Sequence, residues 1–155
     1  GDHPLEGMKF QRHYEELAFK LGGGNYNTPV QLVGDFMKDR VTTKLGKVNP
    51  SVLSNGYRFE DVRKCLPSYV IDGLKEGITD FDRKIKGFGH SDSVLTGIET
   101  RTSAPVRIER NEKLQSISLE GLYPAGEGAG FAGGIVSAAV DGLKVAENIM
   151  KEYRV

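Results

Sequence analysis

The sequence is poor in the features that mark several protein classes. It has a single cysteine, Cys65, in 155 residues, which excludes an internal disulfide and a CxxC redox pair. Basic and acidic residues balance at 21 each without a basic block, so bulk charge does not favour nucleic acid or an anionic membrane. No apolar run approaches the ~20 residues of a membrane span. These absences predict a cytoplasmic protein with no nucleic-acid or membrane partner.

Metal-binding patterns are also missing from the sequence. His3, His13 and His90 have no acidic or nucleophilic partner at motif spacing, and no His/Cys/Asp cluster has the spacing of metal ligands. Surface or capping roles are therefore favoured for the histidines. Cys65 is interpreted as a small buried apolar side chain. No metal site is predicted.

Glycine, by contrast, is abundant, and its 20 residues cluster. The densest cluster follows the apolar stretch 122–125 and comprises Gly126, Gly128, Gly130, Gly133 and Gly134. Small and apolar residues at helical spacing come next, over 135–150. We expect a strand, a glycine turn and a helix, which would gather free backbone N–H groups at the positive end of a helix dipole. Such a turn can bind phosphate or another electron-rich group without a charged side chain.

The series Gly128-x-Gly130-x-x-Gly133 matches the dinucleotide-binding fingerprint. That fingerprint normally opens a strand–helix–strand unit, and here the predicted helix runs to about Glu152, so the sequence given contains no second strand. We therefore interpret the turn as closing a nucleotide site whose main phosphate loop lies elsewhere. The alternative is a tight turn in which glycine only lets the helix pack close to the strand.

The rest of the pattern places helices before strands. Helical spacing predicts helices over 4–21, 28–40, 59–65 and 67–86, the second of them with a capping box at its start. The last of these helices carries a stripe typical of core packing: Ile71, Leu74, Ile78, Phe81, Ile85 and Phe88. Alternation predicts strands over 94–101, 106–109 and 114–119, followed by the strand at 122–125. The predicted fold class is α+β, with a helical N-terminal half, a small sheet and a final strand–glycine turn–helix.

A second glycine cluster, Gly22-Gly23-Gly24, ends the first predicted helix and precedes Asn25-Tyr26-Asn27. Such a turn can adopt positive φ at several positions. It is interpreted either as a loop lying against a ligand or as a helix C-cap and turn.

Four segments occur in the following order: GGGNY (22–26), KIKGF (84–88), LTGIETRTSAPVRI (95–108) and GLYPAGEGAGFAGGI (121–135). Together they resemble the C-terminal third of the bacterial FAD-dependent dehydrogenases of unassigned substrate, the NAD(FAD)-utilizing dehydrogenases, a branch of the glutathione-reductase-like flavoproteins. The resemblance covers nearly the whole chain. Phe131 stands where tyrosine is common and Ala104 where serine is common, and neither departure changes a charge.

The resemblance implies an FAD-dependent oxidoreductase with a small-molecule substrate and with NAD(P) as a candidate second substrate. Members carry an N-terminal strand–GxGxxG–helix that holds the FAD pyrophosphate, which is absent from this sequence. We therefore expect a fragment of a longer chain, part of an α/β FAD-binding fold and inactive alone, whose partner is the N-terminal FAD-binding part. Residues 1–120 would be a substrate-side helix-and-sheet region, and 121–155 the final strand and helix of the FAD-binding domain.

The same resemblance places the flavin contacts at Gly126, Glu127, Gly128, Ala129, Gly130, Phe131, Gly133, Gly134 and Ile135. Related flavoproteins carry an acid at the position of Glu127, which hydrogen-bonds a ribityl hydroxyl or lies near the pyrophosphate. The alternative for Glu127 is a carboxylate that interacts with the helix dipole. N–H groups at 133–135 would stabilise the negative charge that reduction places on the flavin.

Arginines of the predicted strands offer a substrate contact. Arg101 beside Thr102 and Ser103 could hold an anionic group of the substrate, or form a structural ion pair instead. Arg107 and Arg110 could instead make cross-strand pairs with Glu109 or the neighbours of Glu99.

Two non-enzymatic functions stay open beside the oxidoreductase. The chain could be a module that binds a phosphate-bearing ligand at the turn 126–134, or a structural or interaction domain whose glycine turn is incidental. A strand–GxGxxG–helix upstream in the gene would favour the oxidoreductase.

Overall fold

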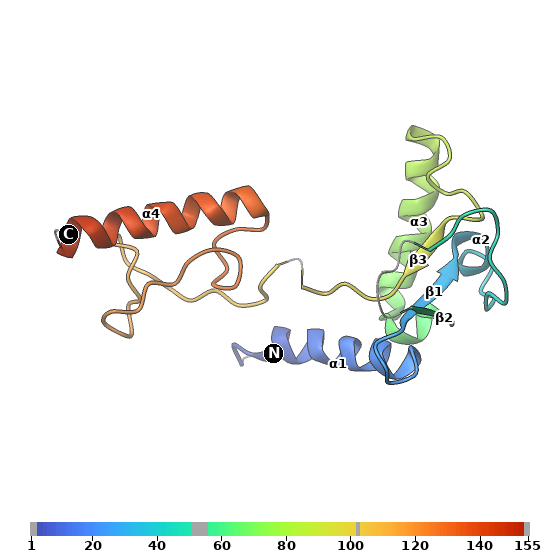
Figure 1. Cartoon of the computed structure of the whole chain (residues 1–155), viewed down its shortest axis with the longest axis horizontal. Helices are drawn as coiled ribbons and strands as arrows, with labels where there is room; N and C mark the ends of the chain where they lie inside the picture. Colours follow the sequence, from blue (N-terminus) through green and yellow to red (C-terminus); the bar gives the residue numbers. More distant parts are fainter. Residues whose placement is uncertain (1–2, 51–55, 102, 154–155) are drawn as a thin grey trace. The chain divides into compact units, whose positions relative to one another are not determined.

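A computed structural model describes residues 3–50, 56–101 and 103–153 (Figure 1). In chain order the elements are α1 (Glu6–Leu21), β1 (Thr28–Leu32), α2 (Val33–Phe36), β2 (Tyr57–Phe59), the 3-10 helix η1 (Val62–Cys65), α3 (Ser68–Lys84), β3 (Val94–Thr96) and α4 (Ile135–Tyr153). Four α-helices and a small mixed sheet in the described residues confirm the α+β class. The chain forms two compact units, one comprising 12–99 and the other 1–11 with 100–155.

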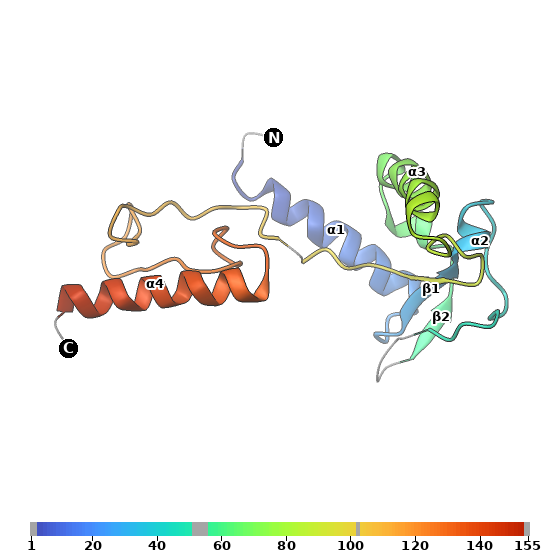
Figure 2. The same ribbon diagram turned by 90° about the horizontal axis from the view of Figure 1, so that it is seen from above.

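The sheet lies in the unit 12–99 and has the strand order β2-β1-β3. β1 lies beside β2 (Figure 2) and pairs with it in parallel, whereas it pairs antiparallel with β3. The registers place Val30 opposite both Phe59 and Thr96. The core beside the sheet is formed by the buried side chains Ala18, Val33, Phe36, Val62, Cys65 and Ile78. One apolar core therefore joins α1, α2, η1 and α3.

The helix predicted over 28–40 is wrong, because 28–32 form the central strand and only Val33–Phe36 is helical. The sequence carries the pattern of a capping box here, but burial of the segment between two strands outweighs this local preference. Gln31 is fully buried, and its side chain donates to the Arg40 carbonyl oxygen at 2.6 Å. Its Oε1 accepts the Val62 N–H at 3.1 Å, so the strand is held by a side chain as well as by its ladder.

The predicted strands after residue 94 form only in part. Val94–Thr96 is a strand, and an isolated antiparallel bridge joins Arg110 to Ser116 around the expected turn at 111–113. The stretch 122–125 is not a strand, contrary to the prediction. Its carbonyl groups bond outside any ladder: the Leu122 oxygen accepts the Ser116 N–H at 2.7 Å, and the Pro124 oxygen accepts from the Arg110 guanidinium at 2.8 Å. A strand needs a neighbouring strand, and the described part of this unit offers none here.

Helix α3 confirms the helix predicted from Pro67, but only part of its apolar stripe is covered. Ile78 is 8% exposed and Ile71 packs against the core, whereas Leu74 is 38% exposed and Phe81 and Ile85 are more so. The prediction that the whole stripe is core is therefore wrong for Leu74 and for the side chains after Ile78.

Truncation at two positions of the apolar stripe of α3 should separate its buried side chains from its exposed ones. Ile78→Ala should lower the free energy of unfolding by about 2–5 kcal/mol, because it leaves a cavity in the core. Leu74→Ala, on the same helix, should cost about 1 kcal/mol or less. Urea unfolding followed by circular dichroism measures both. Equal losses would mean that something else covers Leu74.

None of the described helices is both long and apolar enough to cross a membrane. Within the same described ranges, no three His, Cys, Asp or Glu side chains gather into a group that could hold a metal ion.

Candidate functional site

The glycine turn at 126–134 links the extended stretch 122–125 to α4. Gly126 and Gly130 have φ of 68° and 83°, in the left-handed region that favours glycine. Two backbone hydrogen bonds close the turn: Gly130 N–H to the Glu127 oxygen at 2.9 Å, and Phe131 N–H to the Gly126 oxygen at 3.0 Å. Ala129 is buried, and its carbonyl oxygen accepts the Ile108 N–H at 3.1 Å. The predicted turn therefore exists and is tied to residues near 108.

Gly130 is required by its own chain. A Cβ atom added there would lie 2.6 Å from the Val106 carbonyl oxygen and 3.0 Å from the Arg107 Cα. Gly133 differs, because the Ser103 Oγ is the only atom of the described residues within 4 Å of a Cβ atom placed there, at an ordinary 3.7 Å. The described residues thus leave room for a Cβ atom at Gly133.

Hydrogen-bond donors are unused where α4 begins. No hydrogen bond within the described ranges uses the backbone N–H of Gly133 or Gly134. The first N–H groups of a helix also lack an intrahelical acceptor. Ile135 is 92% exposed, so this helix start is open to solvent. An open groove runs beside it, lined by Phe131, Ser137, Val140 and Lys144 among others.

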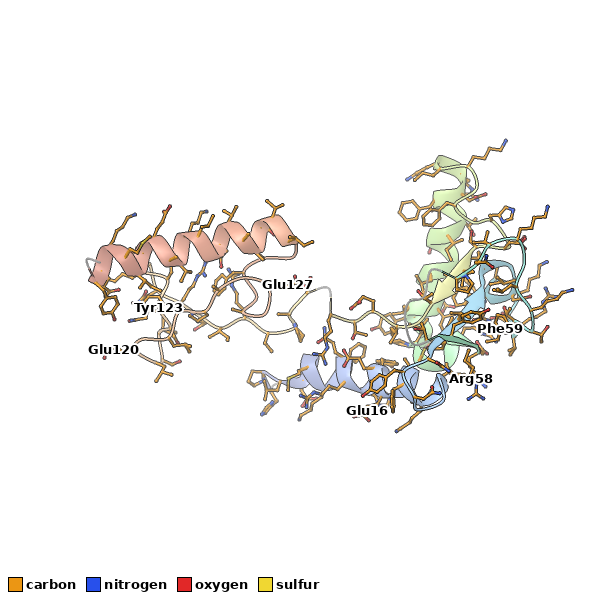
Figure 3. All side chains as sticks on the ribbon, in the orientation of Figure 1. Glu16, Arg58, Phe59, Glu120, Tyr123 and Glu127 are labelled. Carbon is orange, nitrogen blue, oxygen red and sulfur yellow. The ribbon has the colours of Figure 1, made fainter. Side chains whose placement is uncertain are left out.

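Glu127 lies in the turn with a half-buried side chain (Figure 3). Its carboxylate has no hydrogen-bond or ion-pair partner among the residues described. The two interpretations of Glu127, ligand contact and dipole partner, both remain predictions.

An ion pair that the sequence did not reveal fastens the turn to α4. The Arg110 guanidinium forms a bidentate bridge to the Asp141 carboxylate, at 2.6 and 3.0 Å. The same carboxylate accepts the Gly126 N–H at 2.8 Å. Both side chains are nearly buried, 11% and 12% exposed. The Arg110 guanidinium and the Gly126 N–H together lower the pKa of Asp141 to about 2, so the carboxylate stays ionised.

Phe131 connects this ion pair to the other end of the turn. The guanidinium carbon of Arg110 lies 3.6 Å from the centre of its ring, and that of Arg107 lies 4.4 Å away. These are cation–π distances. Of the pairings open to Arg110, the structure shows, among the described residues, an ion pair with Asp141 of α4 and not the cross-strand pair with Glu109 or the neighbours of Glu99.

The candidate substrate segment reaches the same turn at one point. Arg101 is exposed, and Thr102 lies outside the described residues. Ser103 is the residue whose hydroxyl lies beside Gly133. The structure thus brings one predicted substrate residue next to the predicted flavin turn, while Arg101 as a substrate contact stays a prediction.

The turn at 22–27 is a helix cap with a groove beside it. The Gly22 N–H bonds the Ala18 oxygen and the Gly24 N–H the Phe19 oxygen, both at 2.9 Å, which confirms the C-cap interpretation. Tyr26 has a φ of 64° and places its ring 4.9 Å from that of Phe19. A groove of about 430 Å³ lies next to this pair, so the ligand interpretation stays a prediction.

Cys65 and two of the histidines play the structural parts expected of them. Cys65 is fully buried, its thiol donates to the Val62 carbonyl oxygen at 3.1 Å, and burial raises its pKa to about 11. Such a thiol is not a nucleophile at neutral pH. The Nδ1 atoms of His3 and His90 accept backbone N–H groups two residues ahead.

Comparison with known proteins gives the family. Residues 1–102 match the family described as "FAD-dependent protein, C-terminal domain-like". The chain belongs to this family. It is also 68% identical over 153 residues, 99% of its length, to an uncharacterized protein of Clostridium beijerinckii. The chain spans 28% of the length of that relative.

The match to the FAD-dependent C-terminal domain-like family includes some of the candidate residues and not others. It contains the whole unit 12–99, with its sheet and the groove beside Tyr26, and ends at residue 102. The glycine turn and α4 lie beyond the matched residues. Their assignment to a flavin rests on the geometry of the helix start and on the sequence resemblance.

Proposed function

We propose that this chain acts as the C-terminal part of an FAD-dependent dehydrogenase of the glutathione-reductase-like flavoprotein superfamily. The observation that supports this proposal most strongly is the exposed start of α4. Among the described residues, no acceptor bonds the N–H groups of Gly133 and Gly134, and a Cβ atom at Gly133 would meet only the Ser103 hydroxyl within 4 Å. Residues 121–155 would complete the FAD-binding domain and 1–120 would form the substrate-side region.

The residues at the turn fit a flavin. N–H groups at 133–135 would donate to an electron-rich edge of the cofactor, reinforced by the positive end of the α4 dipole. Glu127, whose carboxylate has no partner in the described chain, would accept a hydroxyl hydrogen bond. A bound flavin supplies the capacity to accept a hydride or electrons from a small-molecule substrate.

The outer face of α4 supports a partner polypeptide. Its other face is covered, since Val145 is buried and Asp141 bonds the turn. The outer face exposes an apolar stripe: Ile135, Val136, Val140, Leu143 and Met150. An exposed stripe of this kind marks an interaction surface. We propose that it packs against the FAD-binding part of a longer protein, in line with the greater length of the Clostridium relative.

The absorbance spectrum of the longer protein tests this function directly. Purified from its host, it should show bound flavin in about one-to-one ratio, whereas the 155-residue chain alone should be colourless because most FAD contacts lie outside it. If the longer protein lacks flavin and the isolated 155-residue chain binds inorganic pyrophosphate at the turn, the phosphate-binding module would be favoured over the flavoprotein. Stoichiometric FAD bound to the isolated chain would contradict the proposal that most FAD contacts lie outside these 155 residues.

A further inference from the structure

We propose that Arg110 and Asp141 are positioning residues: they form a clamp that fixes the glycine turn to the start of α4 and thereby aims the N–H donors of 133–135. This inference rests on the proposed flavin role of the turn. Neither Arg110 nor Asp141 belongs to a sequence motif described above.

The clamp begins on the inner face of α4. Asp141 lies two turns into the helix, on the face that also carries Ala138 and the buried Val145. Ala138 packs at this point too, since a Cβ atom on Gly126 would lie 3.7 Å from its Cβ. From this face the Asp141 carboxylate accepts the Gly126 N–H at 2.8 Å. The entry of the turn is therefore bonded directly to the helix that the turn leads into.

Arg110 extends the hold to both ends of the turn. Its Nη1 donates to the Pro124 carbonyl oxygen at 2.8 Å, before the turn, while both Nη atoms bind Asp141. Its guanidinium also lies over the ring of Phe131, after the turn. One side chain thus contacts the chain on each side of 126–130 as well as the helix.

The burial of Arg110 and Asp141 explains why their ion pair persists. An arginine 11% exposed and an aspartate 12% exposed cannot exchange partners with water freely. Arg110 and Lys144 are the cations that lower the pKa of Asp141, together with the Gly126 N–H. The clamp's contribution to stability is therefore present above about pH 4 and is lost as pH falls from about 4 towards 2.

A purely structural ion pair and a positioning clamp respond differently to apolar replacement. Asp141→Ala should weaken flavin retention in the longer protein about tenfold or more and speed exchange of the Gly126 amide by about the same factor. The double variant Arg110→Met/Asp141→Leu should recover stability, because an apolar pair can replace a buried ion pair. It should not recover the Gly126 hydrogen bond or the flavin. Glu152→Gln, which alters an exposed partner of Tyr123 at the far end of α4, is the matched control and should change neither readout.

The result that overturns the inference is recovery of flavin retention by the double variant, normalised to folded protein. Unchanged Gly126 exchange in Asp141→Ala would overturn it as well. If Asp141→Ala fails to fold, Arg110→Lys serves as the second variant, because it keeps the positive charge but cannot form the bidentate bridge to Asp141. The amide exchange is read on the 155-residue chain without flavin. A longer protein without flavin would therefore refute the proposed function, while the exchange data would still decide whether the clamp exists.

Discussion

Gly130→Ala should lower the free energy of unfolding of the unit containing α4 by about 2–5 kcal/mol. A side chain at a φ of 83° costs about 1–2 kcal/mol. The added Cβ would also lie 2.6 Å from the Val106 carbonyl oxygen and 3.0 Å from the Arg107 Cα, and backbone atoms cannot move aside cheaply. Such overpacking adds about 1–3 kcal/mol. Urea unfolding by circular dichroism, with amide exchange over 122–134, measures the loss.

Gly128→Ala is the matched control for Gly130→Ala. Nothing in the described chain lies within 4 Å of a Cβ atom at Gly128, and its φ is outside the left-handed region. Its stability should change by no more than about 1 kcal/mol. If Gly130→Ala were as mild as Gly128→Ala, the contact between the turn and 106–107 would not exist in solution.

Features set by neighbours in sequence could be predicted. Helix α3 follows from apolar residues three and four apart, and α4 from small and apolar residues after a dense glycine run. The glycine turn itself was predictable because left-handed φ values at Gly126 and Gly130 need residues without a side chain. These signals act within a few residues, so one sequence suffices to show them.

Features set by distant partners could not be predicted. The segment beginning Thr28-Pro29 carries the signals of a helix start, yet it is a strand because β2 and β3 bury it on both sides. Periodicity predicts that the whole stripe of α3 is core, because it shows which face of the helix is apolar but not which positions on that face the rest of the chain covers. Local patterns are therefore weakest where packing decides.

The Arg110–Asp141 pair joins residues 31 positions apart, so no motif links them. One signal was present: Asp141 falls on the helical face that carries Ala138 and Val145, and a charge on an inner face requires a partner. That argument predicts a buried cation opposite Asp141 but does not say which of several arginines supplies it. The structure shows that Arg110 pairs with Asp141, whereas the guanidinium of Arg107 lies over the ring of Phe131 without pairing with Asp141.

Gly133→Val in the longer protein should abolish flavin retention, or lower the flavin's reduction potential, while leaving this chain folded. The structure separates the two effects, because among the described residues only the Ser103 hydroxyl lies within 4 Å of a Cβ atom at Gly133. Stability should therefore change little, in contrast to Gly130→Ala. The loss would come from displacing a ligand from the free N–H groups at the start of α4.

Flavin occupancy per folded molecule, from absorbance and circular dichroism, is the deciding measurement for Gly133→Val. Glu127→Gln is its companion, since it keeps the shape of the side chain but removes the charge. If Glu127 accepts a hydroxyl hydrogen bond from the flavin, this change should weaken FAD binding by ~1–2 kcal/mol. If Glu127 only partners the helix dipole, stability should fall slightly and occupancy should stay constant. Full occupancy and an unchanged potential in both variants would remove the flavin from this turn, leaving the open helix start as a site for another phosphate-bearing ligand.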